Sequence, residues 1–370
     1  MGETMNYGFG DPQRANSPRE ICFTNTGDKR ANPDIYTNQS AISEVTRTRQ
    51  LEKKFYPDNA RNHPGMLWVT RTSNFGTTVI YSVDYGNSLW VAGGNAGQLR
   101  TSTDGITWVT QTSNFGTTTI LSVRYANNLW VAGGLAGQLR SSTDAITWVT
   151  RTSNFGTTTI QSVAYGNNLW VAGGNTGQMR TSTDGITWVT RTSNFGITDI
   201  TSVAYGNNLW VAAGRVGQLR TSTDAVTWVT RTSNFGTTQI LSVVYGNSLW
   251  VAVGLGGNIR TSTDAVTWVT RTSNFGTTAI YSVDYGNNLW VAVGDAGQLR
   301  SSTDGITWVT QTSKFGTTNI NSIAYGNSLW VAGSNTGQIR TSDPSKIAVP
   351  EFDSNYLLSR SYYLLRSITR

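Results

Sequence analysis

The sequence predicts an all-β fold: a seven-bladed β-propeller of four-stranded blades, whose last blade is closed by the N-terminal strand. Three observations predict it. The chain repeats with a period of 40 residues from Met66 to Asp343, without an insertion. All 14 tryptophans fall at two positions of this repeat, and seven at each position indicate seven units. Within a unit the apolar residues recur every second position, which favours short β-strands over helices.

Each repeat unit is expected to contain four strands, because runs rich in Val, Ile, Thr, Tyr and Trp are separated by turn residues. In the first complete unit the expected strands span residues 79–85, 89–93, 97–102 and 107–113. The step Tyr85-Gly86-Asn87-Ser88 suits a tight hairpin, because Gly and Asn tolerate positive φ. Four short strands in each 40-residue repeat are typical of a propeller blade.

The two ends of the repeat block predict how the ring closes. The block begins at residues 66–70 with a fourth strand and ends near Ser342 with a third strand. The first strand therefore completes the last blade, which removes an open sheet edge. Because one blade cannot bury enough apolar surface alone, stability is expected to come from packing between blades. Deletion of residues 66–72 is expected to be strongly destabilising.

The segments outside the ring differ from it in composition. Residues 1–65 form a polar N-terminal arm rich in Pro and Asn, with a short helix expected at 41–55, and residues 344–370 form a C-terminal tail with several Leu and Tyr residues. Both are expected to be docking segments, because exposed apolar termini gain little in an isolated domain. No run of signal-peptide or transmembrane length occurs, so we expect synthesis in the cytoplasm and no membrane insertion.

A short turn with an aspartate recurs around the ring, as in STDGITW at residues 102–108. It resembles the Asp-box of BNR and sialidase-like propellers, although the step from Ser to Trp is one residue shorter and the Gly is replaced at Ala145, Ala225 and Ala265. The resemblance implies that the aspartate caps the hairpin between the third and fourth strands, which is a structural role. The repeats are also similar to those of uncharacterised BNR-like proteins of bacteria and bacteriophages. The turn aspartates are Asp104, Asp144, Asp184, Asp224, Asp264 and Asp304.

The ring lacks the side chains that catalysis requires. Glycosidases use paired carboxylates, but no Glu occurs between Met66 and Asp343, and the single His63 lies outside the ring. We therefore expect no enzyme, no metal site and no cofactor. Seven arginines at one repeat position are expected to bond to neighbouring blades or to carbonyl groups rather than to an anion: Arg100, Arg140, Arg180, Arg220, Arg260, Arg300 and Arg340.

The formal net charge of +7 does not favour a nucleic-acid partner. Nucleic-acid binders concentrate Lys and Arg in a patch or stripe. Here the excess is mild and spread around a ring, and Lys314 is the only lysine of the repeats.

The seven copies differ at few positions, and these positions are expected to share one rim. The position of Val79 reads V, T, T, D, Q, A, N around the ring, and that of Tyr81 reads Y, L, Q, T, L, Y, N. Drift at exposed loops would produce this pattern, and so would a contact surface whose chemistry diversified, together with Asn74, Phe75 and their equivalents between blades. The candidate binding residues are Asn95, Leu135, Asn175, Arg215, Leu255, Asp295, Asn335, Tyr81 and Tyr281.

Together these patterns indicate a non-catalytic structural or interaction protein. The leading hypothesis is a tail- or fibre-associated component of a bacteriophage-like virion, which binds other virion proteins through residues 1–65 and 344–370 and displays the propeller for adhesion or assembly contacts. One alternative is a lectin-like propeller that binds a host-surface glycan, with Trp and Phe between blades stacked on sugar rings. Another is an assembly factor of a photosynthetic or other membrane complex.

Overall fold

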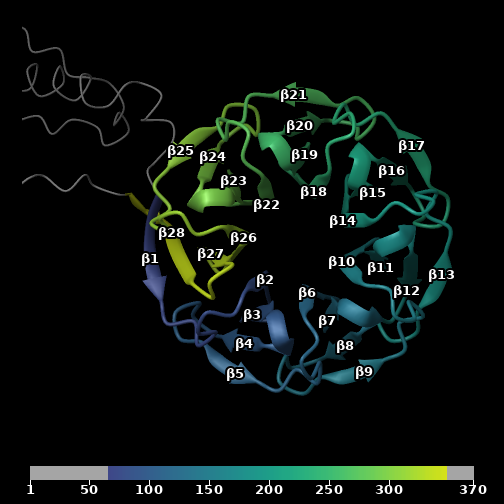
Figure 1. The fold of residues 1–370 in the computed structure, drawn as a ribbon, viewed down its shortest axis with the longest axis horizontal. Coiled ribbons are helices and arrows are strands. Elements are labelled where there is room, and N and C mark those ends of the chain that lie inside the picture. Colours follow the sequence, from purple (N-terminus) through teal and green to yellow (C-terminus); the bar gives the residue numbers. More distant parts are fainter. Residues whose placement is uncertain (1–65, 348–370) are drawn as a thin grey trace, which may run out of the picture. The chain divides into compact units, whose positions relative to one another are not determined.

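Seven four-stranded antiparallel sheets surround a central channel (Figure 1). The computed structural model describes residues 66–347, with side chains as far as Ser342. The predicted all-β, seven-bladed propeller is confirmed. The predicted N-terminal arm, its helix at 41–55 and the tail beyond residue 347 lie outside the described residues. Within 66–347 no helix is long and apolar enough to cross a membrane.

In six blades the strands lie side by side in chain order from the channel outward, and in the last blade the first strand of the chain takes the outer position. The first strands are β2 (Ile80–Gly86), β6 (Ile120–Ala126), β10 (Ile160–Gly166), β14 (Ile200–Gly206), β18 (Ile240–Gly246), β22 (Ile280–Gly286) and β26 (Ile320–Gly326). The second strands are β3 (Leu89–Gly94), β7 (Leu129–Gly134), β11 (Leu169–Gly174), β15 (Leu209–Gly214), β19 (Leu249–Gly254), β23 (Leu289–Gly294) and β27 (Leu329–Ser334). The third strands are β4 (Leu99–Ser102), β8 (Leu139–Ser142), β12 (Met179–Ser182), β16 (Leu219–Ser222), β20 (Ile259–Ser262), β24 (Leu299–Ser302) and β28 (Ile339–Ile347). The outer strands are β5 (Val109–Gln111), β9 (Val149–Arg151), β13 (Val189–Arg191), β17 (Val229–Arg231), β21 (Val269–Arg271), β25 (Val309–Gln311) and, in the last blade, β1 (Met66–Arg71).

The third and fourth strands are shorter than the sequence predicts, because turns take up their ends. Asn95–Gly97 forms a single 3-10 turn, η1, in which Ala96 adopts a left-handed conformation with φ 52°. Strand β4 therefore begins at Leu99 rather than at Gly97. Five other blades carry the same turn: η2 (Leu135–Gly137), η3 (Asn175–Gly177), η4 (Arg215–Gly217), η5 (Leu255–Gly257) and η6 (Asp295–Gly297).

The hairpin between the first and second strands is tight, but Gly86 is not the residue with positive φ. Asn87 and Ser88 have φ of 49° and 58°, as expected for a two-residue type I′ turn. Gly86 is needed for packing instead, because an added Cβ would lie 2.1 Å from Cδ1 of Tyr125 in the next blade. The prediction that Gly86 supplies the positive φ is therefore wrong.

The hydrophobic core is divided among the interfaces between blades. One cluster joins Val171 and Met179 of the third blade to Phe195, Ile200 and Trp210 of the fourth. Six further clusters repeat this arrangement around the described ring. Each blade is therefore stabilised by its two neighbours, as expected from the repeat.

The predicted closure of the ring by its first strand is confirmed. Strand β1 pairs antiparallel with β28, with Trp68 opposite Ser342 and Arg71 opposite Ile339 (Figure 1). Arg71 Nε also donates a hydrogen bond to Thr341 Oγ1 at 2.8 Å. A bulge after Met66 shifts the register, and β28 continues to Ile347, four residues beyond the expected end of the ring at Asp343.

Candidate functional site

The up-and-down strand order gives the ring two different rims. The variable rim contains the turns η1–η6, the turn at 335–337 and the loops that lead into the first strands. The Asp-turn rim contains the two-residue hairpins and the turns of the Asp104 type. Backbone hydrogen bonds bring the two most variable positions together: Asn95 N–H donates to Val79 O at 2.9 Å, and Leu135 N–H donates to Thr119 O at 3.1 Å.

The nine candidate binding residues all lie at the variable rim or at the adjoining mouth of the channel. Seven of them open the turns between the second and third strands. Leu135 and Leu255 are each 40% exposed there. Tyr81 and Tyr281 lie at a bulge at the start of the inner strands β2 and β22 and line the channel. Whether this rim binds a ligand stays a prediction.

Several variable side chains form bonds at this rim, some across a blade junction and one within a blade. Thr119 Oγ1 donates to Asn95 Oδ1 at 2.7 Å. Asp199 Oδ1 accepts from the backbone N–H of Thr176 at 2.8 Å, and Asp199 Oδ2 forms an ion pair with Arg215 Nε at 3.0 Å. Part of the sequence variation is therefore matched between neighbouring blades and stabilises the ring.

Other variable side chains have no such structural use. Val216 is 54% exposed and has φ 53°. A β-branched residue in the left-handed region is strained, since its side chain crowds the backbone there. The neighbouring loop carries Ile197, which is 89% exposed where the other copies have Thr. These apolar side chains are exposed on the variable rim, as are Leu135 and Leu255.

The aromatic side chains between blades cannot form the predicted contact surface. Phe75 and its equivalents are 2–3% exposed, and both sets of tryptophans are buried. The ring of Phe75 is covered by the Arg100 guanidinium, whose Cζ lies 4.6 Å from the ring centroid. The prediction that Phe75 and its equivalents face a partner, and that Trp and Phe stack on sugar rings, is therefore wrong: these residues form the core.

The seven repeated arginines bond to the protein itself. Arg100 is 6% exposed. Its Nε and Nη2 donate to Asn74 O at 3.0 and 2.6 Å, its Nη1 donates to Leu99 O at 3.1 Å, and Nη2 also donates to Gln98 Oε1 at 2.8 Å. These bonds and the aromatic stack occupy the Arg100 guanidinium, which therefore offers no anion site. In the closing blade Arg340 bonds to Gln338 Oε1, and its Nε has no partner among the described residues.

The turn aspartates cap the hairpins of the Asp-turn rim. In the second blade Asp144 Oδ1 accepts from the backbone N–H groups of Ile146 and Thr147 and from Ser142 Oγ, each at 2.8 Å. The bonds from Thr147 and then Ile146 and Ser142 lower the pKa of Asp144 to about 2. A carboxylate that accepts three hydrogen bonds is stabilised in its charged form and is not suited to proton transfer.

Apart from Tyr81 and Tyr281, the central channel is lined by residues that the comparison of the repeats did not single out. It holds a cavity of about 170 Å³. One serine from each inner strand faces it: Ser82, Ser122, Ser162, Ser202, Ser242, Ser282 and Ser322. At six of the seven junctions the serine Oγ accepts a backbone N–H from the next blade, at 3.0 to 3.4 Å. This ring of serines joins the blades and makes the channel wall polar.

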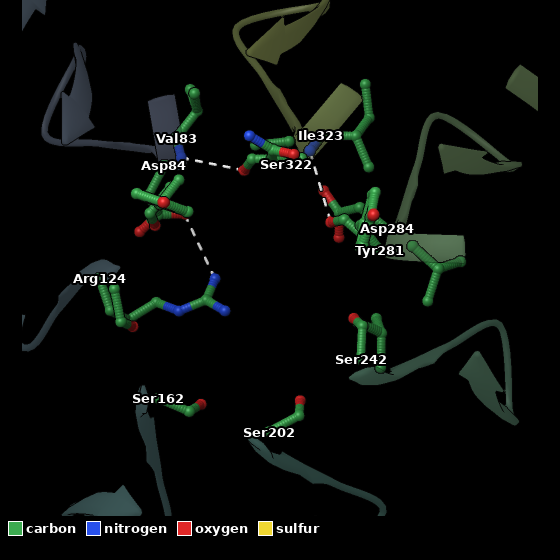
Figure 2. A pocket seen from close by; sticks show the side chains of 18 of the residues that line it. Val83, Asp84, Arg124, Ser162, Ser202, Ser242, Tyr281, Asp284, Ser322 and Ile323 are labelled. Carbon is green, nitrogen blue, oxygen red and sulfur yellow. Dashed lines mark hydrogen bonds and ion pairs between the residues drawn. The ribbon is translucent and has the colours of Figure 1, made fainter. Parts of the chain in front are cut away.

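Two residues further along the inner strands, the channel carries a charged cluster. Figure 2 shows Asp84 and Asp284 on either side of Ser322, with Arg124 extending toward Asp84. Arg124 Nη1 and Asp84 Oδ1 are 3.2 Å apart. Asp84 Oδ2 accepts the backbone N–H of Tyr125 at 2.7 Å, and Asp284 Oδ2 accepts that of Tyr325 at 2.9 Å.

Burial shifts the pKa of both channel aspartates upward. It raises the pKa of Asp284 to about 6, against the opposing hydrogen bond from Tyr325. Burial also raises the pKa of Asp84, although the Arg124 charge and the Tyr125 N–H act in the opposite direction. Perturbed carboxyl groups inside a cavity are typical of functional sites.

The signal for this cluster is present in the repeats. The position of Asp84 reads D, R, A, A, V, D, A around the ring, so two acids and one base interrupt small apolar residues. The same comparison of copies that located the rim would have found it. Within the described residues, no group of three His, Cys, Asp or Glu side chains could hold a metal ion.

Comparisons with known proteins match this architecture. Virginiamycin B lyase from Staphylococcus aureus, solved as an inactive variant with quinupristin, aligns over 75% of this chain and 99% of its own with 8% identity and a TM-score of 0.70. This chain is a β-propeller. The WD40 β-propeller domain of Doa1 aligns over 77% of this chain and all of its own, with 14% identity and a TM-score of 0.64. YCF48 bound to a D1 peptide aligns over 76% of this chain and 96% of its own, with 16% identity and a TM-score of 0.62.

These likenesses show the fold alone. No family model and no curated protein sequence matches the chain. The similar propellers include a lyase as well as a peptide-bound protein and a WD40 domain. Because one fold supports unrelated functions, the comparisons do not decide between binding and catalysis.

Proposed function

We propose that this propeller is a non-catalytic interaction protein whose variable rim binds a partner protein. The observation that carries the proposal is the distribution of differences among nearly identical blades. The repeated Trp, Phe, Arg and turn Asp side chains are occupied by packing and hydrogen bonds. The side chains that differ, and that remain exposed, gather at one end of the ring, where Leu135, Val216 and Leu255 are 40–54% exposed.

The course of the chain supports a display function for this rim. Third strands run from the variable rim to the Asp-turn rim, and β28 is a third strand. Met66 pairs with Ile347, so the chain enters and leaves the ring at the Asp-turn rim. Both ends of the described chain therefore lie at the rim opposite the variable rim. We propose that residues 1–65 and 344–370 anchor the chain in a bacteriophage-like virion, in its tail or fibre, and that the variable rim is directed away from this anchor.

The likeness to YCF48, solved with a D1 peptide, favours a protein or peptide as the partner. It is also compatible with the alternative that the chain is an assembly factor of a membrane complex. In both proposals the variable rim binds the partner, and they differ in where the chain is located. Immunogold labelling of purified native particles separates them, because a free or membrane-associated chain that is absent from particles would exclude the virion proposal.

A matched pair of triple variants tests the rim. Leu135→Asp, Val216→Asp and Leu255→Asp change the variable rim, while Ile146→Asp, Val226→Asp and Val266→Asp change equally exposed residues at the Asp-turn rim, which are 41–55% exposed. We expect the first set to reduce adsorption of particles to host cells, measured per incorporated copy. We expect the second set to leave that ratio unchanged. Equal adsorption by both sets would contradict a binding function of the variable rim.

A glycan is a second candidate partner. Its binding site would be formed by grooves on the blades and not by the buried aromatic residues. Such grooves recur in two neighbouring blades, with cavities of about 620 and 470 Å³. The larger is lined by Thr230, Arg231 and Asn234, and the smaller by Thr190, Arg191 and Asn194. Repeated polar sites would give avidity for a polymer. A glycan array with the full chain tests this candidate, since saturable binding to no glycan would reject it.

A further inference from the structure

The charged residues of the channel occupy one sector of its wall. Blades one and six share the inner-strand sequence IYSVDYG, in β2 and β22. They flank β26 of the last blade, which contributes Asn321 and Ser322 to the cavity. Tyr81 and Tyr281 therefore lie at the mouth of the same sector that carries Asp84 and Asp284 deeper in the channel. In the third to fifth blades the position of Asp84 is Ala, Ala and Val.

The charges in this sector do not balance. Arg124 is the cation of the cluster, and it is bonded to Asp84 at 3.2 Å. Within residues 66–342 no cation lies within ion-pair distance of Asp284. A carboxylate enclosed in a cavity is unfavourable without a charged partner, because the surroundings solvate it less well than water does. Asp284 therefore offers an unmatched negative charge to a ligand that enters the channel.

An acidic path leads to Asp284 from the variable rim. Asp295 opens the turn η6 in the same blade. It lies close enough to Tyr281 at the channel mouth that burial and Asp295 together raise the pKa of this tyrosine to about 12. A positive group that enters from the variable rim meets Asp295, then Tyr281, and then Asp284. The field along this route favours a cation at each step.

The walls around Asp284 supply further oxygen atoms. The serine hydroxyls Ser242 and Ser322 face the cavity in the same region (Figure 2), and Ser282 also lines it. Ser282 and Ser322 each accept a backbone N–H and keep a second lone pair on Oγ. A primary ammonium group has three N–H donors and no acceptor. It therefore matches a site built from one carboxylate and hydroxyl oxygens.

We infer that the channel binds a primary ammonium group at the end of an alkyl chain, and that this group is a lysine side chain of the partner protein, inserted from the variable rim. A divalent metal ion fits less well, because it requires six or more oxygen ligands and several carboxylates, whereas Arg124 lies in the same layer. The alkyl chain passes Leu241, which also lines the cavity. This inference rests on the proposed function, since the partner at the rim supplies the lysine.

Two short peptides test the inference with the purified full chain. The probe is Gly-Gly-Lys-Gly-Gly with blocked termini, and its control replaces lysine with norleucine, which keeps the alkyl chain and removes the ammonium. We expect saturable binding of the lysine peptide by isothermal titration calorimetry and none of the norleucine peptide. Equal binding of both peptides, or saturable binding of neither, would overturn the inference.

Three variants locate the site. Asp284→Asn is expected to weaken lysine-peptide binding by at least about tenfold, since removal of one partner of an enclosed charge pair costs at least that much. Arg124→Ala is expected to strengthen it several-fold, because the competing cation is gone. Asp224→Asn removes an equal charge from the Asp-turn rim and is expected to leave affinity unchanged. Thermal melts establish that each variant is folded before titration.

The direction of these effects decides the outcome. Unchanged affinity in Asp284→Asn would overturn the inference, because the carboxylate would then make no contact with the ammonium. Weaker binding in Arg124→Ala would also overturn it, because a competing cation cannot strengthen the binding of an ammonium group. Affinity for the lysine peptide is also expected to decrease when the pH is lowered below 6, because Asp284 then takes up a proton. The groups that surround Asp284 are Asp84 of β2, Arg124 of β6, the Tyr325 N–H of β26 and Val244 of β18. If the peptides fail while the rim variants still lose adsorption, the lysine site is refuted and the binding rim stands.

Discussion

Replacement of Trp68 by alanine tests whether the ring depends on its closing strand. Trp68 is fully buried and packs with Leu289 of the sixth blade and Trp330 of the last. Loss of a buried tryptophan side chain costs about 3–5 kcal/mol through lost packing and the cavity that remains. The matched control is Trp148→Ala, at the same repeat position and 2% exposed. The direct loss of packing energy is therefore about equal in the two variants.

The two variants differ in what holds the affected strand. The turn of Asp144 joins β9 to β8, so β9 remains next to its partner after the tryptophan is lost. Strand β1 has no such turn to β28 and is held there by pairing, by side-chain bonds such as Arg71 to Thr341, and by Trp68. Local opening requires only that a strand lose its own contacts, and a loss of about 3–5 kcal/mol is a large part of a typical stability of about 5–15 kcal/mol. Trp68→Ala should therefore release β1 under native conditions.

Native-state hydrogen exchange with mass spectrometry, followed by size-exclusion chromatography, measures this release. In Trp68→Ala we expect peptides from β1 and β28 to lose protection first, and the open edge of β28 to produce concentration-dependent oligomers. In Trp148→Ala we expect a lower melting temperature with β1 and β28 protected as well as the other strands. Uniform loss of protection in both variants, or a monomeric Trp68→Ala chain with wild-type protection in β1, would refute the reasoning.

Three further predictions concern single side chains of the blades. Asp144→Asn should cost about 1 kcal/mol, the usual value for an exposed cap screened by solvent. Because the folded pKa of about 2 lies below the ordinary 3.8, this stabilisation is present above pH 3.8 and is lost as the pH falls through 2, so urea unfolding should show a smaller difference from the wild type at pH 2.5 than at pH 7. Arg180→Lys keeps the charge but loses the fork on Asn154 O and the stack 4.5 Å above Phe155, so urea unfolding should show a loss of about 1–3 kcal/mol, and an unchanged midpoint would contradict this. Val216→Gly should raise the free energy of unfolding by about 1 kcal/mol, because it relieves the strain at φ 53°. A thermal melt measures this change, and a lower melting temperature would show that the valine side chain stabilises the rim.

The rim could be predicted from the sequence, but its internal bonding could not. Variation at the positions of Val79 and Asn95 located one end of the ring. The sequence does not show that Thr119 bonds to Asn95, or that Asp199 accepts the Thr176 N–H. These contacts depend on how adjacent blades are rotated and spaced, which local patterns do not encode. Some of the sequence differences at this rim therefore reflect contacts between variable residues, and not drift or ligand binding.

The charged cluster of the channel also could not be predicted from the sequence. Asp84 and Asp284 belong to blades one and six, which become near neighbours only because the ring closes through the last blade. In a linear array these aspartates would lie far apart, and the charge of Asp84 would not raise the pKa of Asp284. The burial of the aromatic residues could not be predicted either. The sequence shows a phenylalanine at position 75 but not whether its ring faces a ligand or the Arg100 guanidinium.

The repeat period, the strand pattern and the unpaired strands at the two ends of the block were sufficient to determine seven four-stranded blades and their closure, because each depends on local backbone preference and on the burial of alternate side chains. The tertiary structure decided which side chains remain available. Burial occupied the tryptophans, phenylalanines and arginines, and closure of the ring gathered Asp84, Arg124 and Asp284 in one channel. Ring closure sets distances between residues of separate blades, and those distances determine which charges are paired and which remain free to bind a ligand.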